Sequence, residues 1–250
     1  MGDLSYRDVV DSRGHVWEFG SGAFHGCISL TSIILPSSLR SIGGCAFRDC
    51  NSLRSIEIPS LVESIGSYAF HGCSSLTSII LPSSLRSIEI RAFGDFISLG
   101  SIEIPSSVES IGSDAFHGCS SLSSIMLPSS LRSIGDYGFR NCCSLRTIEI
   151  PLSVEPIGKR AFEGCSSLTS IILPSSLRSI GENAFEDCSS LIFIEIPSFV
   201  ESIGSNAFYG CSSLTNVTVE SHSIESYERV KLMLIRAGVR ETIIFLKEVD

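Results

Sequence analysis

Hydrophobic residues return along this chain every 23 residues, and small or polar residues fill the positions between them. An Ala-Phe pair marks the period most clearly. It occurs at Ala23-Phe24, Ala46-Phe47, Ala69-Phe70, Ala92-Phe93, Ala115-Phe116, Ala161-Phe162, Ala184-Phe185 and Ala207-Phe208, and Gly138-Phe139 fills the remaining place. Chance does not produce nine pairs in one phase, so the chain is an array of internal repeats.

Other apolar positions keep the same register within each repeat. In the first repeat the Ala-Phe pair is followed by Cys27 and Leu30, and then by Ile33 and Leu35. Because Ile33 and Leu35 alternate with period two, they predict a short strand whose two apolar side chains point inward. Pro36 lacks a backbone donor and ends that strand.

A second inward pair follows the proline. Leu39 and Ile42 predict an opposite wall of the coil, and Gly43 predicts a turn conformation that larger residues resist. About eight of the 23 residues in a repeat therefore face inward. A single coil cannot bury that set, but stacked neighbours can, with about 1.5–3 kcal/mol for each large side chain. The fold class expected is a β-rich solenoid of about nine coils.

These columns resemble a known family. Residues 65–76, Ile-Gly-Ser-Tyr-Ala-Phe-His-Gly-Cys-Ser-Ser-Leu, followed by an Ile-x-Leu-Pro strand, resemble the BspA-type (Treponema pallidum-type) leucine-rich repeat family. The resemblance covers about residues 16–219 and implies a right-handed leucine-rich repeat superhelix. It also implies that the strand face is the concave, ligand-binding one. Members occur on bacterial surfaces and in protists, some act as adhesins, and none supplies a catalytic residue to transfer.

A second periodicity of 46 residues runs through the strands. The residue between the two inward positions alternates between an apolar side chain and a glutamate, and by the period-two rule it faces solvent. These residues are Ile34, Glu57, Ile80, Glu103, Met126, Glu149, Ile172 and Glu195. We interpret this column as a candidate partner-binding surface. The alternative is that β-branched residues simply favour strands.

Charges alternate on another column as well. It reads Arg40, Glu63, Arg86, Glu109, Arg132, Glu155, Arg178 and Glu201. Stacked coils would place opposite charges next to each other there, which indicates register control and solubility. Arg54 and Arg146 sit near Glu57 and Glu149 in the sequence, so local pairing of the strand-face acids is also expected.

Two places break the pattern. In the fourth repeat Glu89 replaces Gly and Phe96 replaces Cys, which predicts a local bend or a looser coil. Further on, Ile192 and Phe193 replace polar residues on the strand face. They either bind a partner or are covered by the C-terminal segment, and we favour coverage because they lie one coil from the end.

The domain organisation follows from where the repeats stop. Residues 1–15 are expected to be a leader or incomplete N-terminal cap, residues 16–219 the solenoid, and residues 220–250 a C-terminal cap. Residues 223–237 have near-helical apolar spacing, Gly238 suits a helix stop, and residues 239–246 read as a strand. A helix that docks a partner is the alternative to a cap.

Composition narrows the function classes. The formal charge is −9, with 18 basic and 27 acidic residues, which argues against a nucleic-acid surface. No apolar run approaches the ~20 residues of a membrane span. With no visible signal peptide, the chain is expected to be cytoplasmic if complete and at the cell surface if it is a fragment.

The sequence contains no candidate residues for catalysis or for metal binding. Eight of the ten cysteines occupy one inward column without CxxC spacing, so we expect free thiols and no zinc. His25, His71 and His117 recur every 46 residues, too far apart to share a metal, and read as turn decoration.

The resulting expectation is a monomeric, non-catalytic scaffold without cofactor, which binds a protein or peptide on its strand face through the column above and through Ile192 and Phe193. A BspA-like surface adhesin or antigen is the alternative, and a purely structural spacer is a third.

Overall fold

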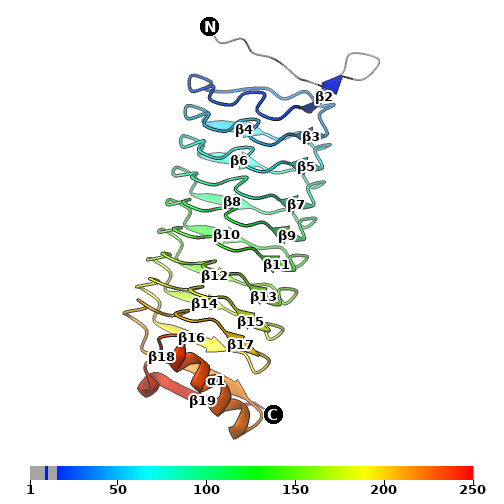
Figure 1. Cartoon of the computed structure of the whole chain (residues 1–250). Coiled ribbons are helices and arrows are strands. Elements are labelled where there is room, and N and C mark those ends of the chain that lie inside the picture. The colour runs from blue at the N-terminus through cyan, green and yellow to red at the C-terminus, as the bar shows by residue number, and fades with distance from the viewer. Residues whose placement is uncertain (1–8, 11–15, 250) are drawn as a thin grey trace.

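The computed structural model describes residues 9–10 and 16–249. The chain forms a β-solenoid of about ten turns of about 23 residues, stacked into one elongated array with a single α-helix at the C-terminal end (Figure 1). The solenoid predicted from the repeats is thus confirmed. Most of the expected leader lies outside the described residues. Of that segment, β1 (Val9–Val10) is described, and it pairs antiparallel with β2 (Val16–Phe19).

Apart from the first coil, which has no strand on the first wall, each coil contributes one strand to each of two walls. The first wall contains β4 (Ser55–Glu57), β6 (Ser78–Ile80), β8 (Ser101–Glu103), β10 (Ser124–Met126), β12 (Thr147–Glu149), β14 (Ser170–Ile172), β16 (Phe193–Ile196), β18 (Asn216–Ser221) and β19 (Ile244–Glu248). The second wall contains β2, β3 (Ser41–Ile42), β5 (Ser64–Ile65), β7 (Ser87–Ile88), β9 (Ser110–Ile111), β11 (Ser133–Ile134), β13 (Pro156–Ile157), β15 (Ser179–Ile180) and β17 (Ser202–Ile203).

Neighbouring coils pair in register along the repeat. Ile102 lies opposite Ile125, and Ile148 opposite Ile171, in parallel strands. A residue and its equivalent 23 positions later are therefore direct neighbours, and each sequence column becomes a stripe along the array. One difference appears in the first coil, where residues 31–36 form no strand. On this wall that coil has a neighbour on one side only, among the described residues.

Stacked phenylalanine rings fill the centre of the solenoid. From Phe24 to Phe208 successive ring centroids are 4.9–6.0 Å apart, and their planes are inclined by 1–26°. The alanine beside each ring is small enough for the coils to approach closely, and Ala46 to Ala207 are buried. The ring column is the part of the core that every coil shares.

The inward cysteines make one specific contact each. From Cys50 onward, the thiol of every cysteine in this column donates to the carbonyl of the phenylalanine 26 residues earlier, as in Cys73 to Phe47 at 3.1 Å. Burial raises the pKa of Cys50 to about 12, and it raises the pKa of Cys165 further. These thiols act as small buried donors between coils, as the sequence predicted for a free-thiol column.

The looser coil predicted at the fourth repeat is present. Strand pairing is interrupted between β5 and β7 on one wall and between β6 and β8 on the other, both between the third and fourth coils. The first wall has a further interruption between β10 and β12, but only at the step between the third and fourth coils do both walls lose their pairing. The ring step from Phe70 to Phe93 is also the widest, at 6.0 Å. Phe96 explains the widening, because its fully buried ring occupies the cysteine position and packs 5.7 Å from Phe93.

The reason given above for Gly43 is wrong. Its φ angle is not in the left-handed region, and a Cβ at this position would instead lie 2.6 Å from the carbonyl oxygen of Phe19. The same holds along the column, where a Cβ on Gly181 would lie 2.6 Å from the backbone of Gly158. Glycine is needed here because adjacent coils touch backbone to backbone.

The C-terminal segment closes the array. Ser223 caps α1 (Ile224–Arg236) by accepting from the Ser226 N–H, and Gly238 follows the helix at φ 100°. Val230 and Leu234 of α1 are buried against the last coil. The final strand begins later than predicted, because a 3₁₀ turn, η1 (Glu241–Ile243), precedes β19.

We expect Gly181→Ala to destabilise the protein by about 1–3 kcal/mol, because its Cβ would force two backbones apart. Gly100→Ala is the matched control: a Cβ there meets nothing within 4 Å, and its φ is not positive. The control should be neutral or stabilise by up to ~1 kcal/mol. Urea unfolding of the two variants measures the difference, and equal stability of both would contradict backbone contact as the cause.

The cysteine column predicts selective thiol reactivity. Cys143 is exposed, whereas Cys73, Cys142 and Cys165 are buried with raised pKa values. At pH 8 we expect iodoacetamide to modify Cys143 fastest and the three buried thiols only after unfolding. Peptide mass mapping over time measures this order, and modification of the buried thiols at the rate of Cys143 would be inconsistent with the structure.

Candidate functional site

The first wall presents its outward side chains as a line along the array. Ile34, Ile80, Met126 and Ile172 are 98%, 65%, 72% and 61% exposed, respectively. The strand register fixes the alternation, since Glu57 lies opposite Ile80, and Glu149 opposite Ile172. The structure therefore brings the predicted column together on one surface, which we call the strand face. It consists of Ile34, Glu57, Ile80, Glu103, Met126, Glu149, Ile172 and Glu195.

Three hollows lie along the strand face. The first, about 650 Å³, is lined by Ile34, Glu57 and Ile80. The second, about 430 Å³, lies between Met126 and Glu149. The third, about 400 Å³, reaches from Glu149 past Ile172 to Phe193. Prolines that end the strands line all three: Pro59 in the first, Pro151 in the second, and Pro174 and Pro197 in the third.

Leu152 also belongs to this surface and was missed in the sequence. It is strongly exposed and lines both the second and the third hollow. The signal was available, because Leu152 stands where most other repeats have the first serine of Pro-Ser-Ser, for example Ser129 and Ser175. A column comparison restricted to the residue after proline would have found it.

The acids of the strand face are not paired as expected. The structure shows no ion pair from Glu57, Glu103 or Glu149, all of which are in its described part, and Arg54 and Arg146 make none with them. The local pairing expected from sequence proximity is therefore wrong. The alternating Arg/Glu column pairs in part, with Arg40–Glu63 at 3.8 Å, Arg132–Glu109 at 3.9 Å and Arg178–Glu201 at 3.0 Å, while Arg86 and Glu155 form no ion pair in the described chain.

Ile192 and Phe193 are not covered by the C-terminal segment. They are 51% and 40% exposed, so the coverage expected above is wrong. The reason is the direction in which the cap grows: α1 packs on β17 and β18, and β19 adds to the edge of the first wall. Neither element folds over the outer side. Two side chains of β19 point to that side: Phe245, which follows Glu195 and Thr218 in the strand register, and Lys247, whose ammonium group contacts Glu195 and Glu220.

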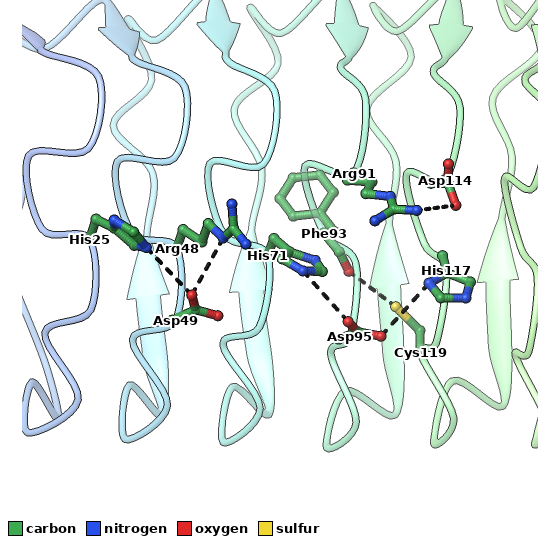
Figure 2. Close-up of polar contacts among 10 residues, drawn as sticks. All are labelled: His25, Arg48, Asp49, His71, Arg91, Phe93, Asp95, Asp114, His117 and Cys119. Carbon is green, nitrogen blue, oxygen red and sulfur yellow. Dashed lines mark hydrogen bonds and ion pairs between the residues drawn. The ribbon is translucent and has the colours of Figure 1, made fainter.

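Histidines and aspartates link the turns next to the phenylalanine column (Figure 2). His25 contacts Asp49 at 3.5 Å, and Asp95 is approached by His71 at 3.7 Å and by His117 at 3.8 Å. The description of these histidines as turn decoration was therefore incomplete, because each pairs with a carboxylate on an adjacent coil. The guanidinium carbons of Arg48 and Arg91 lie 5.6 and 5.8 Å, respectively, from the centroid of the Tyr68 ring.

The backbone of these turns explains part of the 46-residue period. The residue that precedes the cysteine position has a positive φ angle in every coil. Its identity alternates from one coil to the next between Gly and either Asp or Asn, as in Asp49 and Gly72. A Cβ on Gly118 would collide with a carboxylate oxygen of Asp95, so the acid occupies the space that the glycine leaves. Asp and Asn tolerate this conformation better than most residues. Two successive coils therefore form one complementary unit.

The described residues offer no metal centre. They contain no group of three or more His, Cys, Asp or Glu side chains placed to hold a metal ion. Asp95 with its two histidines is a polar contact between coils. None of the helices in the described part of the chain is long and apolar enough to cross a bilayer.

A family model for the BspA type leucine-rich repeat region matches residues 17–146 and 132–230, which together span most of the chain. The chain belongs to this family. The family consists of leucine-rich repeat scaffolds, which are typically non-catalytic. It includes cell-surface and antigen proteins.

Solved structures of relatives agree with this assignment. The leucine-rich repeat protein of T. pallidum is 27% identical, with a TM-score of 0.65 over 91% of this chain and 92% of that one. A leucine-rich cell surface protein of Faecalibacterium prausnitzii is 26% identical, with a TM-score of 0.50 over 94% and 77%. The pneumococcal vaccine antigen PcpA shares the fold at 23% identity, with a TM-score of 0.54 over 86% and 66%. No curated protein matches the chain significantly.

The Asp95 contacts generate a pH prediction. Burial lowers the pKa of His71 below its ordinary value of 6.5, and the Asp95 carboxylate opposes that shift. We expect Asp95→Asn to lower the pKa of His71 further, as followed by NMR titration of its ring protons. Asp187→Asn is the matched control, since it changes the same column four coils away, and Asn141 shows that asparagine fits there.

The same shift sets the sign of the stability change with pH. Because the folded pKa of His71 is depressed, the unfolded chain binds more protons, and the stability contribution is complete above pH 6.5 and lost as the pH falls. His71→Gln should reduce that acid-side loss. An unchanged His71 titration in Asp95→Asn would contradict the contact.

Proposed function

We propose that this protein is a non-catalytic scaffold that binds a protein or peptide partner on its strand face. The observation that carries the proposal is the line of exposed Ile34, Ile80, Met126 and Ile172, each bordering one of the three hollows. Exposed apolar side chains that gather on one surface favour an interaction site over simple solubility. Ile192, Phe193 and Leu152 extend the surface toward the C-terminal end.

The geometry suits recognition of a macromolecule better than chemistry on a small one. The hollows follow one another along the strand face, and the residues that line them repeat from coil to coil. A rigid core holds them, so little ordering of the scaffold would oppose binding. The typically non-catalytic character of the family supports the same conclusion.

A triple variant tests the proposal. Replacing Ile80, Met126 and Ile172 with serine should abolish capture of the native partner by immobilised protein, because the apolar contacts are lost. Stability should change by less than about 0.5 kcal/mol, since the three side chains are exposed. The matched control replaces Ile28, Ile97 and Leu232, which are exposed outside the strand face. Equal capture by the wild type and the strand-face variant would exclude this surface.

A second candidate is a surface adhesin or antigen that contacts host or matrix proteins. It is favoured by relatives that are described as a cell surface protein and as a vaccine antigen. Labelling of intact native cells with a membrane-impermeant biotin reagent tests it. Labelled protein would support this function, and recovery of the protein in the unlabelled cytosolic fraction alone would exclude it.

A further inference from the structure

We infer that the partner segment is an amphipathic α-helix that lies along the strand face and carries Lys or Arg once per heptad. This inference rests on the proposed function and specifies its ligand. It combines the charge of the strand face, the spacing of its side chains and the length of the exposed line.

The unpaired acids of the strand face favour a ligand of positive charge. Glu57, Glu103 and Glu149 lie between exposed apolar residues and make no ion pair within the described chain, while three of the four glutamates of the Arg/Glu column do, namely Glu63, Glu109 and Glu201. Repeated, unpaired carboxylates of one sign repel each other, and a ligand with matching cations would relieve that repulsion. Apolar side chains on either side of each acid require an apolar residue next to each cation.

The spacing of the coils selects the conformation of the ligand. Strands on this wall are ~4.8 Å apart, and the stacked rings of the coils that carry the line, from Phe24 to Phe162, are 4.9–6.0 Å apart. An α-helix has a pitch of ~5.4 Å, so its i, i+3/i+4 residues meet successive coils. A heptad of ~10.5 Å then spans two coils, which is the 46-residue period of the Ile/Glu alternation.

Other peptide conformations do not match both the glutamates and the apolar residues of the strand face. An extended strand brings every second residue to the same face, ~6.7 Å apart, and falls out of phase with the coils. A polyproline helix returns to the face every ~9.3 Å, so it would meet either the acids or the apolar residues, and not both. Of these three conformations, only the α-helix presents one residue to each successive coil, so that apolar and basic residues can alternate along it.

The length of the line gives the size of the segment. From Ile34 to Ile172 the face crosses six coil steps, or ~30 Å, which corresponds to a helix of ~20 residues. Such a helix would place four apolar residues opposite Ile34, Ile80, Met126 and Ile172. Three cations, each three or four residues after an apolar one, would lie opposite Glu57, Glu103 and Glu149.

Designed peptides test this inference with the full chain. A 22-residue helical peptide with Leu at a and Lys at d is compared with an isomer in which the lysines move to f, away from the apolar stripe. Fluorescence anisotropy measures binding, and circular dichroism verifies equal helix content. We expect the first peptide to bind roughly tenfold more tightly than its isomer, and binding to weaken as salt is raised. No binding, or equal binding of the isomers, would overturn the inference.

Charge reversal supplies the second arm. A triple variant should no longer bind the Lys peptide, and it should bind a version of the peptide with Glu at position d. The substitutions are Glu57→Lys, Glu103→Lys and Glu149→Lys. The matched control reverses Glu89, Glu225 and Glu248, which are exposed, lie outside the strand face and form no ion pair in the described chain, and it should bind as the wild type does. If the charge-reversed protein still captures the native partner while the serine triple variant does not, the proposed function stands and the basic helix is wrong.

Discussion

Stacking of each side chain on its own equivalent is the constraint from which the rest of this structure follows. Coils ~5 Å apart place every residue against the residue 23 positions away. Phenylalanine, alanine and cysteine tolerate a copy of themselves as neighbour, so their columns are uniform. Like charges repel each other when they are stacked. At the left-handed turn residues, two side chains on adjacent coils would collide. Columns of those kinds alternate, and the Arg40–Glu63 and Asp49–Gly72 pairs show why the true unit is two coils.

Periodicity predicted what depends on stacking alone. The two walls, the buried Phe column, the thiols between coils and the exposure of Ile80 or Met126 all follow from register, which a sequence states directly. Even the loosened fourth coil was visible, because Phe96 breaks a column of small residues.

What the sequence did not predict depends on lateral distances. Arg54 is three residues from Glu57, yet the two do not pair, since the extended backbone separates their side chains. Coverage of Phe193 required knowing the direction in which the cap grows. The close contact at Gly43 is between backbones, which leave no signature other than the glycine. For the candidate site, the column and Leu152 were readable from the sequence, and the hollows were not.

The weak step between the third and fourth coils has a mechanical meaning. In an array held together by nearest-neighbour contacts, the local cost of opening an interface decides where cooperativity ends. Here both walls lose their pairing at one step, while the ring column continues through it. Under tension along its axis the molecule would part first at that step. The coils before that step would then unfold together, while the longer part after it, which ends in α1, would stay folded.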